Sequence, residues 1–390
     1  MISYFNSMAQ TIDNSITSRP RLASMTPLLK TTALTVDYDQ DTRMLQAQGA
    51  ISMLVQPALN KINQRLAEEK PALVREDDIV ASTWLPPIPS GPFKRLVLSE
   101  AKMAIGRFVP QTVSIEVTRA CGCSCDHCVI KEGEGELGTE EINRVVDEAL
   151  DLGASIITFT EGDPLLREDI FDLIRHVDPE RAVVNIFTPG LEMTAEKAKK
   201  LKDAGLYNIL IGVYSTDPIV HDQIRGVPGA HEKAVEAIKM ALDAGLLVTM
   251  SAHIKGDRVS DIFDLYEFAK DLGVHEFSIW EGMPKSAEEQ LSQIDRETII
   301  RFYKKVNRTP GGPRVFANTY FEGEMLGCMA GRRWLHVGVD GEVRACPYLG
   351  DSWGNVREMA LKNIWNDIRR SGEFDPLRSD CPAQSRHLGP

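Results

Sequence analysis

The sequence lacks any apolar stretch approaching the roughly 18 residues that a membrane-spanning helix needs. Its opening run, MISYFNSMAQTIDNS, has neither the basic segment nor the apolar segment of a secretory signal. Basic charge is scarce too, because 44 Lys and Arg stand against 56 Asp and Glu, for a formal net charge of −12. A general nucleic-acid binder would show a basic surface, so we expect no nucleic-acid partner. These absences predict a cytoplasmic protein.

Cysteine is also rare, and its distribution is uneven. The 390 residues include 7 cysteines, and four of them fall in the stretch CGCSCDHC at 121–128. Cysteines so close in sequence form no relaxed disulfides with one another. In a reducing compartment, clustered cysteines are more often metal ligands. The stretch is therefore predicted to hold a metal centre.

The middle of the chain alternates short apolar runs with amphipathic ones. Strands are predicted at 112–117, 155–162, 182–188, 208–215, 247–254 and 276–283. Helices are predicted from the 3.6-residue periodicity at 139–153, 165–177, 194–205, 231–245 and 259–273. Continuous apolar strands indicate a parallel sheet that is covered on both faces. The fold class is therefore α/β, either doubly wound or curved into part of a barrel, with reactive groups at the C-terminal ends of the strands.

The cysteine stretch follows the first predicted strand, at the edge where such a sheet places chemistry. The spacing that matters is Cys121-x3-Cys125-x2-Cys128. Three thiolates can hold three irons of a cubic [4Fe–4S] cluster, which ordinarily takes four cysteines, and the fourth iron then keeps an open position. A zinc site with His127 as its fourth ligand is the alternative. Cys123 fits no ligand position.

This CxxxCxxC loop after the first strand resembles the radical S-adenosylmethionine (radical SAM) superfamily, over roughly residues 111–310. The resemblance implies a partial (β/α)6 TIM-like barrel in which S-adenosylmethionine (SAM) binds at the open iron. Glu161-Gly162-Asp163-Pro164 occupies the place of the family's Gly-Gly-Glu-Pro segment, which grips the SAM amino group. This chain departs from that segment, because Glu161 replaces the first Gly and Asp163 is one methylene shorter than Glu.

The same resemblance implies further SAM contacts. Thr188 and Ser215 end the third and fourth strands, where the family places polar contacts to the ribose and the carboxylate. Arg225 matches an arginine that pairs with that carboxylate, which suits the geometry of a guanidinium fork. His127 stands where the family usually has an aromatic residue, near the adenine. Taken singly, Asp163 and Ser215 are equally well explained as helix-cap or turn residues.

The other three cysteines, Cys328, Cys346 and Cys381, follow the predicted barrel. Between the first two lies an Asp340-Gly341 hairpin turn, and a predicted helix precedes the third. This segment resembles a SPASM/twitch domain in its shorter twitch form. The resemblance implies that these cysteines bind one auxiliary [4Fe–4S] cluster, whose fourth ligand is left open. A zinc knuckle or three buried thiols are the alternatives.

Three domains are expected: a helical N-terminal extension at 1–110, the radical SAM core at 111–310, and a twitch domain of β-hairpin and helix at 311–390. Within the extension, 42–67 reads as an amphipathic helix, and the run 94–108 is both basic and apolar. Such a helix contacts a membrane surface or an anionic substrate, or it caps the bottom of the barrel. We prefer the cap, because most amphipathic helices face a core.

The resemblance implies an enzyme that cleaves SAM reductively, with an electron from an external flavodoxin-like or ferredoxin-like donor. The resulting 5′-deoxyadenosyl radical abstracts hydrogen from a substrate C–H bond, and the auxiliary cluster assists. Trp280, Glu281, Tyr320 and Glu322 are the candidate substrate contacts.

The substrate class follows less directly. The apolar, basic N-terminal segment favours a lipid or isoprenoid and a peripheral membrane contact. A peptide or peptide-derived cofactor, or a tetrapyrrole side chain, is the alternative substrate. An iron–sulfur electron-transfer or sensor protein is the non-enzymatic alternative, but it would have no need of SAM-gripping residues.

Overall fold

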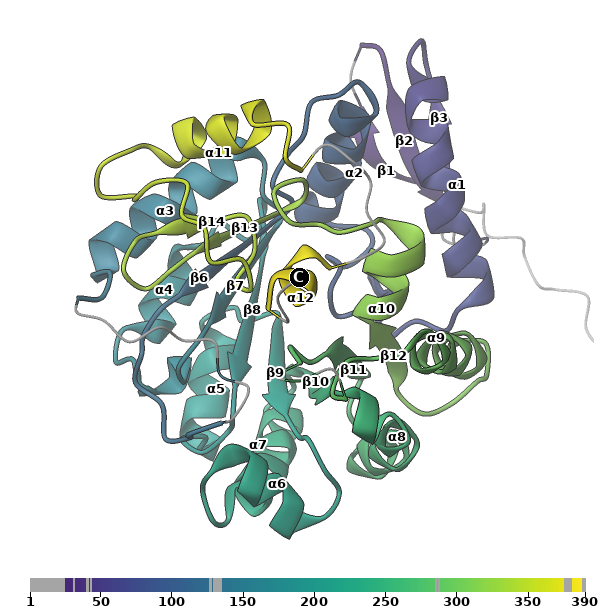
Figure 1. The fold of residues 1–390 in the computed structure, drawn as a ribbon. Helices are drawn as coiled ribbons and strands as arrows, with labels where there is room; N and C mark the ends of the chain where they lie inside the picture. The colour runs from purple at the N-terminus through teal and green to yellow at the C-terminus, as the bar shows by residue number, and fades with distance from the viewer. Residues whose placement is uncertain are drawn as a thin grey trace, which may run out of the picture.

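A nine-stranded sheet forms the centre of the molecule (Figure 1). The computed structural model describes residues 25–374 and 381–387, apart from 31, 40, 41, 43, 126, 127, 129–134, 285 and 287. The strand order is β12-β11-β10-β9-β8-β7-β6-β13-β14, and every neighbouring pair is parallel except β13 with β14. The C-terminal ends of the parallel strands therefore open on one side of the molecule.

The predicted β-α units are present in their predicted order. The strands are β6 (Thr112–Glu116), β7 (Ile156–Thr160), β8 (Val183–Thr188), β9 (Asn208–Gly212), β10 (Leu247–Ile254) and β11 (Glu276–Glu281), and β12 (Arg314–Ala317) adds a strand that the sequence did not predict. The main covering helices are α3 (Thr139–Leu152), α4 (Ile170–His176), α5 (Ala195–Asp203), α7 (Ala230–Asp243), α8 (Asp261–Leu272) and α9 (Gln293–Asn307), with the short α6 (Pro218–Arg225) before α7. The α/β partial barrel is confirmed.

Helix α3 shows why these runs fold as they do. Its apolar positions recur with helical spacing, and Ile142, Val145 and Val146 are buried against the sheet. The helix ends at Gly153, whose φ of 109° is a left-handed conformation that glycine adopts without a Cβ clash.

The C-terminal segment continues the barrel's own sheet. Strands β13 (Trp334–Val337) and β14 (Val343–Arg344) form the predicted hairpin, with Gly341 at a φ of 88° in its turn. The sequence did not predict that β13 would pair in parallel with β6. Helix α11 (Leu361–Arg370) packs on α3, and in α12 (Pro382–His387), which follows Cys381, Gln384 donates to Glu281 at the C-terminal end of β11 (Figure 1).

The N-terminal extension differs from the expected helical one. Strands β1 (Met25–Lys30), β2 (Thr35–Asp39) and β3 (Met44–Gln48) form an antiparallel sheet, followed by α1 (Ser52–Glu68), the small pair β4 (Leu73–Val74) and β5 (Ile79–Val80), and α2 (Gly91–Ala104). The expected helix at 42–67 is wrong in its first part. Alternate residues of MLQAQ face inward there, and Gly49 at a φ of 109° separates strand from helix.

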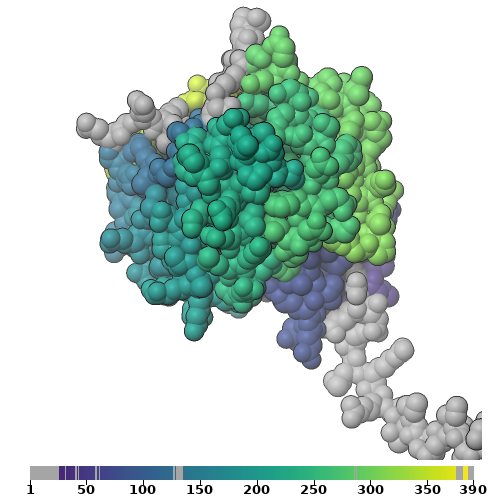
Figure 2. Space-filling model, turned by 90° about the horizontal axis from the view of Figure 1, so that it is seen from below, coloured from purple at the N-terminus to yellow at the C-terminus, as the bar shows by residue number. Residues whose placement is uncertain are grey.

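Two hydrophobic cores divide the chain near residue 100. One contains residues of the extension from Leu28 to Val97, and the other runs from Val113 to Ala383. The blue and purple surface of the extension projects at one edge of the molecule, beside the teal and green surface of the barrel (Figure 2). The extension thus has a core of its own, whereas the radical SAM core and the twitch segment share one. The domain limits at 110 and 310 stay predictions.

Helix α2 lies over the N-terminal ends of the strands. Leu96 and Val97 are buried, and the Arg95 guanidinium donates to the carbonyl oxygens of Leu150, in the last turn of α3, and of Ala154, just after it. These contacts agree with the cap interpretation, although Ile105 is 56% exposed. In the described part of the chain, no helix combines the length and the apolar character that crossing a membrane requires.

Candidate active site

The three cysteines of the CxxxCxxC loop open onto one cavity at the C-terminal ends of the strands. This loop cavity has a volume of about 170 Å³, and Cys121, Cys125 and Cys128 all line it. Glu161, Gly162, Thr188 and Arg225 line it as well. The structure thus brings together residues from strand ends that lie about 100 positions apart in the sequence.

The segment after β7 crosses the stem of the cysteine loop at close range. A Cβ on Gly162 would lie 2.5 Å from the carbonyl oxygen of Thr118 and 2.6 Å from that of Ala120. The backbone N–H of Asp163 donates to the same Ala120 oxygen at 2.7 Å. Both Glu161, with a φ of 62°, and Gly162, with a φ of 60°, are left-handed. A strained non-glycine residue of this kind is typical of functional sites.

Asp163 does not line the loop cavity, contrary to what a direct contact with SAM requires. Its side chain is fully buried, and Oδ1 accepts hydrogen bonds from the Leu165 N–H at 3.1 Å and the Thr188 hydroxyl at 2.7 Å. Burial raises the pKa of this carboxyl. Ser215 is similar, because its hydroxyl accepts from the Asp217 N–H at 3.1 Å and does not reach the cavity. Both residues take the cap or turn role in this structure.

Glu161 faces the loop cavity in place of Asp163. Burial, with smaller contributions from Glu116 and Cys121, raises the pKa of this carboxyl to about 8. Within the described residues no cation pairs with it. Glu161, which stands where the family has a glycine, is therefore the carboxylate that is available to an ammonium group.

Arg225 is a buried guanidinium held on three sides. It donates to the Gly212 carbonyl at 2.8 Å and to the Cys125 sulfur at 3.5 Å, and it lies 4.4 Å above the Tyr214 ring. Burial opposes its charge, but nearby Tyr214 and Cys125 raise its pKa above the ordinary value. Its Nε is buried without a hydrogen-bond partner, so this donor is unused. Such a group suits an anion in the cavity.

The fourth thiol of the loop differs from the other three. The Cys123 N–H donates to the Cys121 sulfur at 3.4 Å. A side-chain hydrogen bond from Cys123 lowers the pKa of Cys121 to about 7, and bonds to Cys121 and Cys125 raise the pKa of Cys123. Cys123 does not line the cavity. His127 lies outside the described residues.

The thiols fit an iron–sulfur cluster by their placement. In the described part of the chain, no three Cys, His, Asp or Glu side chains stand at the mutual distances of a finished metal centre. However, the donors are soft thiols that face a shared cavity, and Cys121 is poised to ionise. Thiolates are the ligands of iron–sulfur clusters.

A second cavity of about 390 Å³ adjoins the first, and we call it the auxiliary cavity. Cys328, Cys346 and Cys381 all line it. Burial raises the pKa of Cys346 and of Cys381. The three thiols that sequence spacing grouped together thus face one space, as a cluster site requires.

Three aromatic side chains form the partition between the two cavities. Trp280, Trp334 and Tyr348 each line both of them. Trp280 was expected at the cavity, but Trp334 and Tyr348 were missed. Tyr348 stands two residues after Cys346 in CPYLG, and Trp334 owes its place to the pairing of β13 with β6. The position of Tyr348 beside a cysteine was the one signal in the sequence.

Trp334 is held in the partition by a buried polar chain. Its indole N–H donates to the Ser114 hydroxyl at 2.8 Å, and His336 Nδ1 lies 2.9 Å from the same oxygen. His336 Nε2 lies 2.9 Å from a Glu116 oxygen, and the Val339 N–H donates to the other. Burial opposes ionisation of Glu116, but the bond with His336 lowers its pKa overall.

Of the other three expected substrate contacts, two line the auxiliary cavity and one does not. Glu281 and Glu322 line the auxiliary cavity, and Glu281 pairs with Arg296 at 2.9 Å. Tyr320 does not line it. Its ring stacks on Tyr303 with a centroid distance of 4.5 Å.

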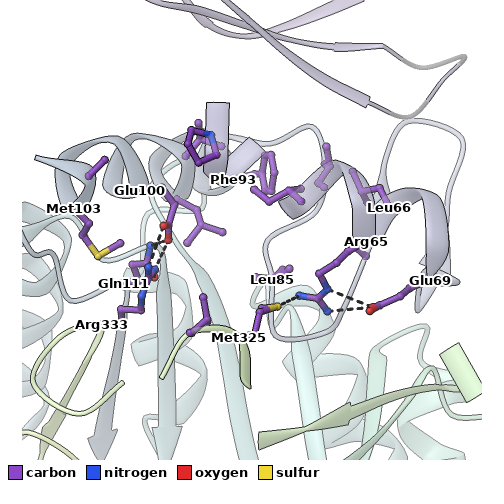
Figure 3. Close-up of a pocket in the computed structure, with 18 of the residues that line it drawn as sticks. Arg65, Leu66, Glu69, Leu85, Phe93, Glu100, Met103, Gln111, Met325 and Arg333 are labelled. Carbon is purple, nitrogen blue, oxygen red and sulfur yellow. Dashed lines mark hydrogen bonds and ion pairs between the residues drawn. The ribbon is translucent and has the colours of Figure 1, made fainter. Parts of the chain in front are cut away.

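A third cavity, of about 440 Å³, is larger but has no cysteine in its lining (Figure 3). It lies between α1, α2 and the N-terminal ends of the strands. Figure 3 shows its charged groups turned toward one another, with Arg65 against Glu69 on one side and Glu100 against Arg333 on the other. It sits at the end of the strands opposite the cysteines, so it is not the candidate active site.

Comparisons with known proteins agree with this geometry. A sequence model of the radical SAM superfamily matches residues 115–269, and a model of the SPASM iron–sulfur cluster-binding domain matches residues 328–384. The AdoMet-dependent heme synthase of Methanosarcina barkeri is 24% identical, over 70% of this chain and 87% of its own. The PqqA peptide cyclase of Rhizobium meliloti is 26% identical, over 70% and 76%.

The fold is shared with a solved structure. Streptococcus suis SuiB bound to its precursor peptide SuiA superposes with a TM-score of 0.58, at 12% identity, over 88% of this chain and 87% of that one. The two family models cover both cysteine sets, at 121–128 and at 328–381. The chain therefore is a radical SAM superfamily enzyme with a C-terminal SPASM iron–sulfur domain, and it uses SAM with one [4Fe–4S] cluster and an auxiliary iron–sulfur cluster.

Proposed function

We propose that this enzyme abstracts a hydrogen atom from a peptide held in the auxiliary cavity, using SAM bound in the loop cavity. The observation that carries the proposal is the aromatic partition of Trp280, Trp334 and Tyr348, which faces both spaces. A substrate that reaches past the edge of these side chains, where the two cavities adjoin, would contact SAM directly. Neighbouring placement of reactants is what a radical transfer requires.

Each charged part of SAM has a counterpart in the loop cavity. The cysteines Cys121, Cys125 and Cys128 hold the cluster and leave one iron for SAM. Glu161 accepts from the ammonium group, and Arg225 receives the carboxylate through N–H donors that the protein leaves unused, Nε among them. Thr188 lines the cavity beside them, with its hydroxyl donated to Asp163. Asp163 is therefore a positioning residue in this proposal.

When bound, the reduced cluster supplies the electron that breaks the sulfonium C–S bond, which gives methionine and a 5′-deoxyadenosyl radical able to take hydrogen from the substrate. The chain's part is orientation and exclusion of water. The buried ring of Trp280, fixed against Trp84 at 5.0 Å, closes the space on the barrel side. A small flavodoxin-like or ferredoxin-like protein remains the proposed electron donor.

A peptide fits the auxiliary cavity better than a tetrapyrrole with several carboxylates. Among the described residues that line the cavity, Arg296 is the single cation, and its guanidinium already binds Glu281. A polyanion would therefore meet the carboxylates of Glu281 and Glu324 without a free positive group among the described lining residues. The amide groups of Gln290, Gln293 and Gln384 suit peptide hydrogen bonds instead. The peptide cyclase and SuiB, whose names refer to peptides, support this class.

The tetrapyrrole class is kept as a second candidate, because a heme synthase is similar over 70% of this chain and 87% of its own. The expected lipid substrate gains no such support. The large apolar cavity lies away from the cysteines, and the relatives' names refer to a tetrapyrrole or a peptide.

The experiment uses the full chain, with both clusters reconstituted, SAM and a chemical reductant. Peptides encoded beside the gene are supplied with deuterated side chains, and a carboxylated porphyrin labelled in the same way is the second arm. Deuterium appearing in 5′-deoxyadenosine from a peptide supports the proposal. Transfer from the porphyrin, with none from any peptide, overturns the peptide assignment.

A further inference from the structure

The auxiliary cluster has too few cysteines to bind all four of its irons. A cubic [4Fe–4S] cluster takes four protein ligands, and this cavity presents Cys328, Cys346 and Cys381. The chain's seventh cysteine, Cys123, is hydrogen-bonded to Cys121 and Cys125 in the loop of the other cluster. The fourth ligand is therefore not a thiolate of this chain.

Three carboxylates line the auxiliary cavity, and two of them are already engaged. Glu281 binds Arg296 at 2.9 Å and accepts from the Gln384 amide at 3.2 Å. Glu324 pairs with Lys304 at 3.0 Å. A carboxylate that is bound to a cation would have to give up this partner before it could bind iron.

Glu322 is the remaining carboxylate. Its hydrogen bond comes from the backbone N–H of Met329, the residue that follows Cys328, and within the described residues no cation lies at ion-pair distance from it. It faces the cavity near Cys346 and Cys381. Its immediate neighbours are acidic or thiol groups, so a negative charge here has no source of compensation in the protein itself.

The backbone around Glu322 is also unusual. Residues Phe321–Met325 form a turn of π-helix between α10 (Asn318–Tyr320) and the segment that carries Cys328. Such wide turns are rare, and they are frequent at functional sites because they re-aim a side chain. Here the wide turn contains Glu322, whose carboxylate faces the three cysteines.

We propose that Glu322 is the fourth protein ligand of the auxiliary cluster, through a carboxylate oxygen. Three thiolates and one carboxylate would then complete the four iron sites, and the fourth iron would be the cation that the carboxylate otherwise lacks. Consequently no iron of this cluster is open to substrate. The inference depends on the auxiliary cluster and not on the identity of the substrate.

The test uses a chain in which Cys121, Cys125 and Cys128 are replaced by Ala, so that the auxiliary cluster is the one cluster present. Mössbauer spectra and iron content are measured after anaerobic reconstitution. The oxygen-ligated iron should give a separate doublet of about one quarter of the iron, since one iron in four differs from the others. In Glu322→Cys this doublet should merge with the thiolate-ligated irons.

Glu322→Gln should lose the distinct iron and yield about three irons per chain, with the EPR signal of a [3Fe–4S] cluster after mild oxidation. Glu324→Gln, two residues away and paired with Lys304, is the matched control and should leave the spectrum as in the parent. Spectra of Glu322→Gln and Glu322→Cys that are identical to the parent would overturn the proposal. Because this background does not cleave SAM, the result is independent of the peptide proposal.

Discussion

The hydroxyl of Thr188, at the end of β8, donates a hydrogen bond of 2.7 Å to Oδ1 of Asp163, just beyond the end of β7. This bond joins two neighbouring strand ends and uses the acid that the family pattern would direct at SAM. The carboxylate that is left for the cavity is Glu161, on a backbone with a φ of 62°. The exchange of roles between these acids can be tested directly.

Glu161→Gln should weaken SAM binding by about 10-fold to 100-fold, since a charged hydrogen bond contributes ~1.5–3 kcal/mol. Burial raises the pKa of this carboxyl to about 8, so the SAM-free enzyme holds it largely protonated at pH 7. An ammonium group favours the ionised form, so binding should release a proton and tighten as pH rises from 6 to 8. Calorimetric titration in buffers of different ionisation enthalpy measures both effects.

Asp163→Asn is the comparison for this variant. It should disturb Thr188 and lower thermal stability, while SAM binding still tightens with pH. The same pH dependence in Glu161→Gln as in the unmodified enzyme would contradict the role given to Glu161.

Gly162→Ala should abolish SAM cleavage or prevent stable loop formation. The new Cβ would lie 2.5 Å from a backbone oxygen of the cysteine loop, and neither backbone can move without the other. Gly205→Ala is the matched control, because Gly205 also has a positive φ, of 93°, but a Cβ added there would have nothing within 4 Å. Gly205→Ala introduces backbone strain without a clash, whereas Gly162→Ala introduces both. Comparing the 5′-deoxyadenosine formation and the melting temperature of the two variants therefore isolates the effect of the clash.

The reconstituted enzyme should contain close to eight irons per chain, because two sets of three cysteines line separate cavities. Replacing Cys121, Cys125 and Cys128 by Ala should halve the iron and abolish SAM cleavage. Cys123→Ala should retain the full iron content, since this thiol does not line the cavity. Iron and zinc are counted by mass spectrometry, and zinc in both sites would refute the assignment.

Arg314→Ala should destabilise the protein by ~3–5 kcal/mol, which is typical when one partner of a buried ion pair is removed. Arg314 is 2% exposed, it binds Glu69 at 2.5 Å, and it approaches the fully buried Glu276 at 3.6 Å. Arg308→Ala breaks an exposed pair with Glu68 and should cost ~0–1 kcal/mol. Urea unfolding of the two variants provides the comparison, and equal losses would show that the network adds no stability.

Leu96→Asp should unfold or strongly destabilise the extension, because Leu96 is 8% exposed in its core, whereas Ile105→Asp should be tolerated on the surface. If α2 instead binds membranes, the unmodified protein should sediment with anionic liposomes at low salt and not at high salt. With α2 as a cap, we expect no sedimentation at either salt concentration.

The sequence predicted the barrel because its strands are continuous apolar runs that repeat with helices between them. Strand β12 escaped because RVFA is a run of only four residues, and the pairing of β13 with β6 escaped because these two strands lie more than 200 positions apart. The stretch 44–48 was misread because five residues cannot establish a period, and its alternation is visible only against the partner strand β2.

In the candidate site, too, local patterns could be predicted from the sequence, whereas features set by backbone turns and distant strand pairing could not. Cys121, Cys125 and Cys128 could be predicted as one ligand set because their spacing lies within a single short loop. The choice between Glu161 and Asp163 depended on a left-handed turn, which determines which of two nearby acids faces the cavity. Trp334 depended on the pairing of β13 with β6, a contact between residues more than 200 positions apart. No local pattern reports such a pairing.

The pairing of β13 with β6 also determines whether the barrel can be separated from the SPASM segment by truncation. Strand β6 leads into Cys121, and the hairpin that begins with β13 leads into Cys346, so one continuous hydrogen-bonded ladder fixes the separation of the two clusters. Removing the SPASM segment would uncover the β6 edge and its unpaired backbone groups. A truncated core should therefore associate through that edge rather than act as an independent SAM-cleaving unit, and a swap with another SPASM segment would have to preserve the strand register.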